Sequence, residues 1–506
     1  MNFTARACAF SLCLLASAAR SQAGSPAVAT DQEAFLRQVL LRNPSIQAES
    51  LSVAGSQETR SGATSLLLPQ FAITGKLSGT SDLDDSRSAL AQAGATVSQI
   101  LPTGGTLQGQ ALTQRAYSAT NSTSAPVYSD TARLVAQLLG IPLSTGSKSS
   151  SSTRDSLGLG VSFTQPLLRG FGDGAQSFYQ IDQARASLKV QIHSSRAQVL
   201  ATVGSARKAW WNQLSQEALW SARIQDTIRT DKLLKVARQK LSIGSGTVLD
   251  TLQAYADHLQ ARSDCLLAWT NARSSAIDLG TYLDTSEVWI HPVPDTSIAL
   301  PIPPKETFGS ADALLKQAET NSPDLAQAMA LEEKARSEEL FRKRETRPTL
   351  DAGVFARKAI LPDMTFAQSV NYGGQINLLW DIPDGVNRAS ARKALLDLRK
   401  TGIQAAKARK DIRRTLQRLL DQNSQRTQAL DLSAQVLAAQ QARLVSSLQG
   451  YKDGSVSWTD VLSARRDWMN AIVNSWTQMS SLQANITDIQ SLTGTGPASL
   501  GWNWGE

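Results

Sequence analysis

The sequence predicts a mixed α and β membrane protein made of two tandem structural repeats, in which short amphipathic strands are joined to unusually long helices. Two windows, between Pro166 and Pro292 and between Pro383 and Pro497, contain no proline. Because proline inside a helix costs about 3 kcal/mol, these windows permit long uninterrupted helices. A strand-like alternation of apolar and polar residues precedes each window, and the same order of segments occurs twice.

The first residues have the features of a secretory signal peptide, which we predict over residues 1–23. Arg6 supplies positive charge, residues 7–19 are apolar, and Ser21-Gln22-Ala23 is a cleavage site of the small-x-small type. The apolar stretch is too short to cross a bilayer as a helix, and no later apolar run is long enough. An exported chain of this kind enters a membrane only as a β-barrel.

Short motifs recur at matched positions in the two halves. Asn43-Pro44 recurs as Asn321-Ser322-Pro323, and Leu68-Pro69 recurs at the same separation as Arg347-Pro348. Gly244 to Asp250 aligns with Gly454 to Asp460, but at a shorter separation. The first half therefore carries an extra segment, whose Ser- and Thr-rich part over residues 117–153 predicts an exposed loop.

These matches divide the chain into five parts. We predict the signal peptide over 1–23, a first repeat over 24–284, a proline-rich linker over 285–309, a second repeat over 310–494 and a C-terminal tail over 495–506.

Each repeat is predicted to contain two shorter helices, then strands, then a long helical hairpin. The predicted shorter helices cover residues 31–41, 45–66, 310–319 and 324–345. The predicted strands cover residues 71–78, 157–164, 350–357 and 372–381. Residues 95–111, turning at 102–105, predict an additional hairpin, and whether it joins the same sheet is left open. Alternation with period two is typical of a barrel wall, but also of a half-buried sheet in a soluble protein.

The second proline-free window carries a heptad pattern of apolar residues. Leu416, Leu430, Leu437, Leu444 and Tyr451 share one register. This spacing predicts that the long helices pack as coiled coils.

Composition and motifs give no indication of an enzyme. The formal charge is +8, but the charges are interspersed and form no basic patch with aromatics, so nucleic acid is not an expected partner. His193, His258 and His291 lack ligand spacing, so no metal or other cofactor is expected. The stretch from Gly170 to Ala175 imitates a dinucleotide-binding loop, but its glycines are predicted to let the chain turn sharply.

Several of these segments resemble the TolC-type outer-membrane efflux (outer membrane factor) family. They are Asn43-Pro44, Thr164 to Gly170, Gly244 to Asp250 and Tyr451 to Asp460, in the family's order and in both halves. The resemblance implies a homotrimer in outer-membrane lipid, extending into the periplasm. Each copy would give about four strands to a shared barrel of about twelve, continued by an α-helical barrel of coiled-coil hairpins.

The resemblance also implies a function. The chain would be the passive exit duct of a tripartite efflux or type I secretion system, working with a periplasmic adaptor protein and an inner-membrane transporter. The alternative from the residues alone is a soluble periplasmic coiled-coil scaffold, which needs no lipid-facing strands.

Residue by residue, the resemblance places a gate at the periplasmic tip. Asp460 matches an acid that rings the closed entrance, and Asp250 with Tyr451 matches a hydrogen-bonded lock. The tip turns, which contain Gly244, Gly246 and Gly454, would contact the adaptor.

The residues by themselves also allow a purely structural role at the tip. In that case both acids begin helices, where the helix dipole favours them, and Tyr451 is a seam residue. Val456 and Ser463 depart from the family pattern, in which an arginine and a second acid occupy these positions.

Overall fold

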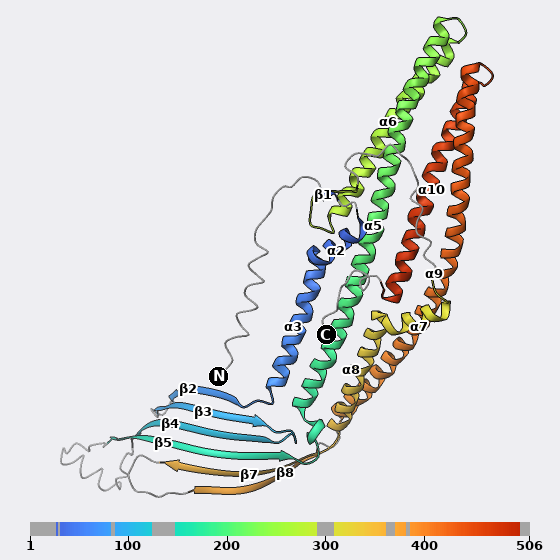
Figure 1. Ribbon diagram of the computed structural model, residues 1–506. Coiled ribbons are helices and arrows are strands. Elements are labelled where there is room, and N and C mark those ends of the chain that lie inside the picture. Colours follow the sequence, from blue (N-terminus) through green and yellow to red (C-terminus); the bar gives the residue numbers. More distant parts are fainter. Residues whose placement is uncertain are drawn as a thin grey trace, which may run out of the picture. The chain divides into compact units, whose positions relative to one another are not determined.

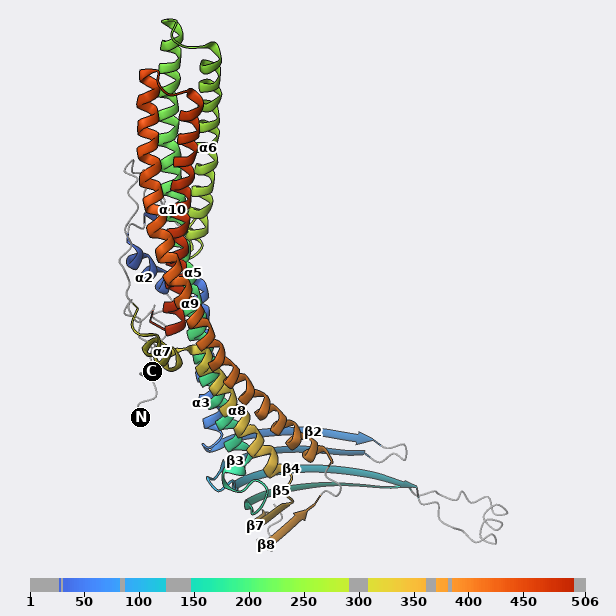
Figure 2. The same cartoon turned by 90° about the vertical axis from the view of Figure 1, so that its right-hand side faces the viewer.

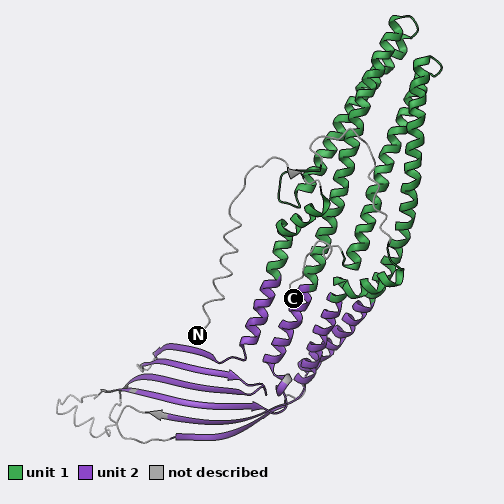
Figure 3. Ribbon diagram, in the orientation of Figure 1, with its two compact units in different colours: residues 1–52, 193–326, 407–506 green, residues 53–192, 327–406 purple. Residues whose placement is uncertain are grey.

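The computed structural model describes residues 27–28, 31–81, 87–123, 147–290, 308–360, 370–380 and 385–495. The chain splits into two compact units, coloured separately in Figure 3. Unit 1 comprises residues 1–52, 193–326 and 407–506, and unit 2 comprises residues 53–192 and 327–406. The predicted signal peptide, most of the predicted linker and nearly all of the predicted tail lie outside the described residues.

Unit 2 contains an antiparallel sheet of six strands in the order β2-β3-β4-β5-β7-β8 (Figure 1). The strands are β2 (Gln70–Ser81), β3 (Arg87–Ile100), β4 (Thr106–Thr123), β5 (Ser147–Pro166), β7 (Thr349–Ile360) and β8 (Val370–Leu379). The structure confirms the four predicted strands. It also places the hairpin predicted at 95–111 inside the sheet, as parts of β3 and β4. The family resemblance, which implied about four strands, is corrected to six in the described chain.

The Ser- and Thr-rich segment is only partly the loop that its composition predicted. Residues 117–123 and 147–153 are strand, paired from Tyr117 with Thr153 to Thr123 with Ser147. Ser118 and Ser152 also share a hydrogen bond of 2.8 Å between their hydroxyls. The ladder satisfies the backbone groups of Ser and Thr as it does those of any other residue, so composition alone misplaced the strand ends. Residues 124–146 lie outside the described part of the chain.

The register gives the sheet one apolar and one polar face. Most of the large apolar side chains of the first face are exposed: Phe71, Ile73, Leu77, Val97, Leu107, Leu157, Leu159, Val161, Val354, Tyr372, Ile376 and Leu378. The opposite face carries mostly amides, hydroxyls and charges: Thr74, Lys76, Gln92, Thr96, Gln110, Gln114, Ser162, Arg357, Gln375 and Asn377. The charged exceptions on the apolar face include the Arg115–Asp155 ion pair at 3.3 Å.

A glycine-dependent turn joins this sheet to the start of the helix α5 (Gln176–Ser242). Gly170 and Gly172 have φ of 88° and 56°, a region that favours glycine. Gly104, with φ 82°, lies so close to this turn that a Cβ on it would be 2.2 Å from the Gly170 carbonyl oxygen. The glycines of residues 170–175 therefore form a turn, as predicted.

Four long helical segments dominate unit 1 (Figure 2). They belong to α5, α6 (Val248–Gly280), α9 (Gly385–Asp453) and α10 (Trp458–Thr493). The 67 residues of α5 and the 69 of α9 each span about 100 Å at about 1.5 Å per residue. None of the described helices combines the length and apolar character needed to cross a membrane.

The shorter helices also match the predictions. They are α2 (Gln32–Arg42), α3 (Pro44–Ser65), α7 (Ala311–Asn321) and α8 (Pro323–Glu345). Pro44 and Pro323 each occupy the first helical position, where the missing N–H leaves no hydrogen bond unmade. Two short strands, β1 (Ala27–Val28) and β6 (Val288–Trp289), pair in parallel.

The heptad residues of α9 form a buried seam in unit 1. Leu416, Leu430, Leu444 and Tyr451 are 8% exposed or less. Leu444 packs with Trp468 and Ile472 of α10, and with Ala222 of α5. The predicted coiled-coil packing of the long helices is confirmed within this unit.

The close approach at Gly104 gives a stability prediction. We expect Gly104→Ala to reduce the yield of folded protein severely, because the new methyl meets backbone and φ is unfavourable for alanine. Gly75→Ala in β2 is the matched control, since a Cβ there meets nothing within 4 Å. Equal yields of the two variants, measured as protease-resistant protein, would contradict this account of the turn.

Candidate functional site

The two helical hairpins of unit 1 end in turns with the same backbone design. Gly244 and Gly454 have φ of 73° and 82° and follow the last residues of α5 and α9 closely. In the first turn the N–H groups of Ser245 and Gly246 donate to the Lys240 carbonyl, both at 3.0 Å. In the second, Ser455 and Val456 donate to the Gly450 carbonyl at 2.9 and 3.2 Å. Each turn is thus closed by a left-handed glycine that satisfies helix-end carbonyls.

Each turn needs a second glycine, because two of its residues approach each other closely. This glycine is the later residue of the pair in the first turn and the earlier residue in the second. A Cβ on Gly246 would lie 3.0 Å from the Lys240 Cβ, and a Cβ on Gly450 would lie 2.4 Å from Val456. Positions 240 and 246 correspond to 450 and 456. Only one residue of each touching pair can carry a side chain, which explains why Val456 is accommodated.

Asp250 and Asp460 occupy equivalent positions at the start of the second helix of each hairpin. Asp250 forms a capping box with Thr247: its N–H donates to the Thr247 hydroxyl at 3.0 Å and its carboxylate accepts from the Thr247 N–H at 3.4 Å. The Ser457 hydroxyl accepts from the Asp460 N–H at 3.2 Å and donates to the Asp460 carboxylate at 2.6 Å. Both acids therefore stabilise helix starts, and Asp460 is also exposed to solvent.

Tyr451 is buried between the hairpins. Its ring packs against Trp458 at 5.2 Å, and the Lys240 ammonium lies 4.3 Å from the ring centroid. Lys240 also donates to the Tyr451 carbonyl oxygen, so this α5 residue ties the first hairpin to the second. Burial, and then the nearby Asp250 carboxylate, raise the pKa of Tyr451. Among the described residues no hydrogen bond joins the Tyr451 hydroxyl to Asp250.

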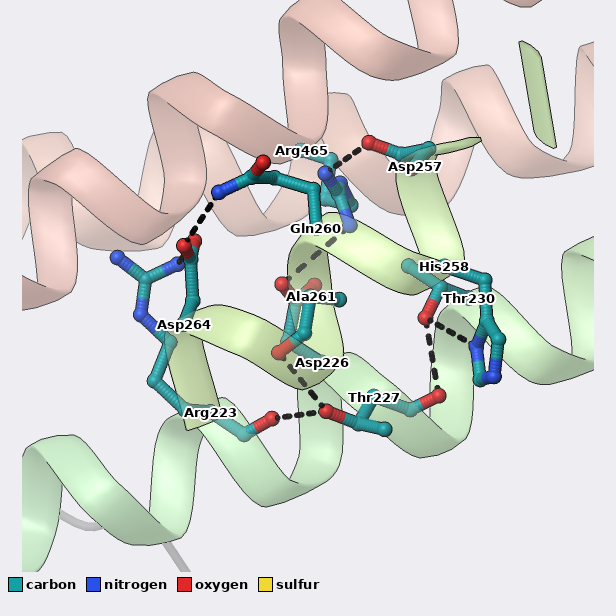
Figure 4. Close-up of polar contacts among 10 residues, drawn as sticks. All are labelled: Arg223, Asp226, Thr227, Thr230, Asp257, His258, Gln260, Ala261, Asp264 and Arg465. Carbon is teal, nitrogen blue, oxygen red and sulfur yellow. Dashed lines mark hydrogen bonds and ion pairs between the residues drawn. The ribbon is translucent and has the colours of Figure 1, made fainter. Parts of the chain in front are cut away.

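A buried ionic cluster lies deeper between the hairpins (Figure 4). Arg465 of α10 contacts Asp226 of α5 at 3.4 Å and also Asp257 of α6. All three side chains are 8% exposed or less. A single guanidinium therefore joins three helices, and it links the α5–α6 hairpin to the α9–α10 hairpin.

The cluster is incompletely satisfied. The second carboxylate oxygens of Asp226 and Asp257 are buried and have no hydrogen-bond partner within the described chain. Burial raises the pKa of both carboxyls, although the Arg465 charge opposes this effect. Arg229 lies over the Trp468 ring at 4.4 Å, and burial lowers its pKa. Paired charges that are buried contribute little net stability, because the loss of hydration offsets their mutual attraction.

Polar contacts within the first hairpin surround this cluster. Arg223 and Asp264 form an ion pair at 3.0 Å, and the Thr227 hydroxyl donates to the Ala261 carbonyl at 3.3 Å. These contacts join α5 to α6, whereas Arg465 and Lys240 join the two hairpins.

The sequence contains a weak signal for this cluster, which our sequence analysis missed. Asp226 follows Ala222 by four residues, and Asp257 lies between Ala254 and Ala261, so both acids fall in stripes of small buried residues. A stripe of small residues at helical spacing indicates a packed helix face, and a charged residue is unexpected on such a face. The sequence alone does not show that Arg465 is buried and not the adjacent Arg466.

Metal binding receives no support at these positions. Within the described ranges, no group of three or more His, Cys, Asp and Glu side chains is arranged to hold a metal ion.

Comparison with known proteins was informative only at the level of structure. No protein-family model and no curated protein matches this sequence. The chain is similar to the solved structure of CusC, studied for conformational changes accompanying folding and transmembrane channel formation. Identity is 14%, the match covers 94% of this chain and 95% of CusC, and the TM-score is 0.65. The chain has the fold of the TolC-type outer-membrane channels.

Two further channels support the same fold. The Neisseria gonorrhoeae MtrE outer membrane channel, solved in its open state, is 16% identical, with coverage of 92% and 89% and a TM-score of 0.64. The Campylobacter jejuni CmeC outer membrane channel is 13% identical, with coverage of 95% and 90% and a TM-score of 0.64. The likeness therefore extends over nearly the whole chain of each channel.

On this channel fold, the buried cluster predicts a pH-dependent effect of Arg465→Met. Removing the cation leaves two buried carboxylates unpaired, so we expect a loss of about 3–5 kcal/mol in hairpin stability near pH 8. A carboxyl with a raised pKa in the folded state takes up its proton at a higher pH than in the unfolded chain. Lowering the pH through the folded-state pKa therefore stabilises the variant, and its deficit should shrink. Thermal unfolding followed by tryptophan fluorescence between pH 8 and 5 measures both effects.

Arg443→Met is the matched control. Arg443 pairs with Asp467 at 2.7 Å, but both side chains are more than 40% exposed. Such a pair contributes about 0–1 kcal/mol. Equal, pH-independent deficits in the two arginine variants would show that the buried cluster has no special role.

Proposed function

We propose that the chain is the outer-membrane exit channel of a tripartite efflux or type I secretion system. Three copies would surround one aqueous passage, with a β-barrel in the outer membrane and an α-helical barrel in the periplasm. A periplasmic adaptor and an inner-membrane transporter would supply cargo and energy. The observation that carries this proposal is the exposed apolar face of the sheet, on a fold shared with outer-membrane channels.

The sheet is suited to lipid on one side and water on the other. Its exposed apolar residues lie on every strand of one face, which is the alternation of a transmembrane wall. A soluble scaffold would have to leave the same large apolar surface in water, where such patches cause association. The membrane channel is therefore favoured over the periplasmic scaffold.

The helical hairpins also have faces suited to neighbouring copies. Exposed apolar residues of α6 recur at helical spacing: Leu249, Leu252, Tyr255, Leu259 and Leu266. In the same unit, α9 exposes Leu432 and Val436, which lie one helical turn apart on one face. Within the described residues these apolar side chains of the two hairpins are exposed, which supports packing of α6 from one copy against α9 of the next.

The tip turns are the proposed periplasmic entrance. Gly244, Gly246 and Gly454 would form the surface that the adaptor contacts, and three exposed Asp460 carboxylates would line the closed opening. Tyr451, held by Lys240 and adjacent to Asp250, would keep the hairpins together at rest. Preferential adaptor binding to separated hairpins would then shift the population towards the open state.

Planar-bilayer conductance of the purified mature protein tests the channel. We expect small resting conductances that increase in Lys240→Met, because this variant loses the cation over the Tyr451 ring and the hydrogen bond to the Tyr451 carbonyl oxygen, both of which join the two hairpins. Unchanged conductance in that variant would refute the proposed lock but leave the proposed channel standing. Protein that stays soluble without detergent and forms no channels would favour the scaffold.

Ion selectivity tests the gate assignment with matched variants. Asp460→Asn removes the proposed ring of charge, so the preference for cations should fall towards none. Asp431→Asn removes an exposed carboxylate of α9 that lies outside the proposed ring and the proposed lock, and selectivity should persist. Reversal potentials in a salt gradient measure both, and identical values for the two variants would contradict the Asp460 ring.

A further inference from the structure

We propose that three copies join their six-stranded sheets into one barrel of eighteen strands, wide enough at its outer end for cargo of polypeptide size. The inference rests on the proposed trimeric channel and departs from the barrel of about twelve strands that the family resemblance implied. The additional strands are β3 and β4, so the inference depends on whether this hairpin is part of the wall.

The pairing places β3 and β4 within the sheet. β3 pairs with β2 from Arg87 to Ser98, and β4 pairs with β5 from Thr106 to Thr123. No described residue pairs β2 directly with β5, because the hairpin lies between them. A hairpin that covered the channel mouth would instead leave β2 and β5 adjacent.

The two faces of the sheet continue unchanged across this hairpin. On β3, Ala91, Ala93, Ala95 and Val97 share the face of the exposed apolar residues of β2. Gln92 lies on the opposite face and donates to the Gln114 side chain of β4 at 3.2 Å. Alternation of this kind suits strands with lipid on one side and water on the other.

Within the described residues, the sheet has two edge strands without a pairing partner, and these edges are complementary. β2 and β8 are its outer strands, and five antiparallel steps between them make them run in opposite directions. The β8 of one copy can therefore pair antiparallel with the β2 of a second copy, with their apolar faces on the same side. An open edge in lipid would leave backbone groups without partners, so the occupant of each edge is another copy of this chain.

Six strands are too few to close alone. With strands about 4.7 Å apart and tilted by about 40°, six strands would enclose a backbone diameter of only about 12 Å. Lys76, Gln110 and Arg357 of the polar face would have no room there, since even eight strands leave an interior filled by side chains.

Eighteen strands make a much wider passage than twelve. The same geometry gives a backbone diameter of about 35 Å for eighteen strands and about 23 Å for twelve. An α-helix with its side chains is about 10–12 Å across. After the lining side chains are included, the wider barrel still admits a helical hairpin of a polypeptide.

Counting strands tests the proposal directly. Electron cryomicroscopy of the purified mature protein in lipid nanodiscs should show eighteen strands around a threefold axis. Twelve strands, whether from two copies of six or from three copies with the hairpin outside, would overturn it. Conductance is measured separately. A conducting barrel of twelve strands would therefore refute the proposed strand number but not the proposed channel function.

Adjacent variants of β3 give an independent test. Ala93→Arg places a charge on the apolar face, and we expect at least a tenfold loss of assembled protein from the membrane fraction. Gln92→Arg places the same charge on the polar face and should assemble normally. Equal assembly of both variants would show that β3 does not face lipid.

Polymer access measures the width itself. In channels whose tip is open, neutral polymers about 20 Å in hydrodynamic diameter should enter from the outer side and reduce conductance, whereas a barrel of twelve strands should exclude them. Exclusion of such polymers from a conducting channel would overturn the proposed cargo class.

Discussion

The backbone hydrogen bonds of the six-stranded sheet impose the constraint on which the rest of the molecule depends. Lipid offers no partner for an N–H or a carbonyl group, so a sheet with an exposed apolar face must have no open edges when it enters a membrane. One copy has edges at β2 and β8 and too few strands to close. Association with further copies is therefore a physical requirement of the proposed membrane form. The exposed apolar residues of α6 would favour the same association along the helices.

The contact between the hairpins combines two kinds of interaction with different consequences. Apolar packing around Leu444 and Trp468 gains free energy from burial, whereas the Arg465 cluster contributes little net stability because its charges lose hydration. When the hairpins separate, these charges regain water and part of the cost is recovered. In the proposed gate, the cluster would therefore fix the register of the closed hairpins. It would add little to the free energy needed to separate them.

Local patterns predicted most of the fold, because proline-free windows, period-two alternation and the Asn43-Pro44 motif each have one dominant structural cause. Composition failed for residues 117–123 and 147–153, since the pairing of a Ser-rich strand depends on a partner distant in the chain. At the tip, the sequence located Asp250 and Asp460 but not their helix-capping contacts. Lys240 and Arg465 were missed because which side of a long helix is buried depends on its neighbours.

The central claim is that edge strands of different copies pair to close the wall, and cysteine cross-linking tests it most directly. In a Cys265→Ser background, one cysteine replaces Thr74 on β2 and a second is moved along β8 from Asn371 to Asn377. The account predicts oxidation products that stop at three chains, at one register and only for β8 positions on the polar face with Thr74. Cross-links absent at every register, or confined within single chains, would contradict closure by copies.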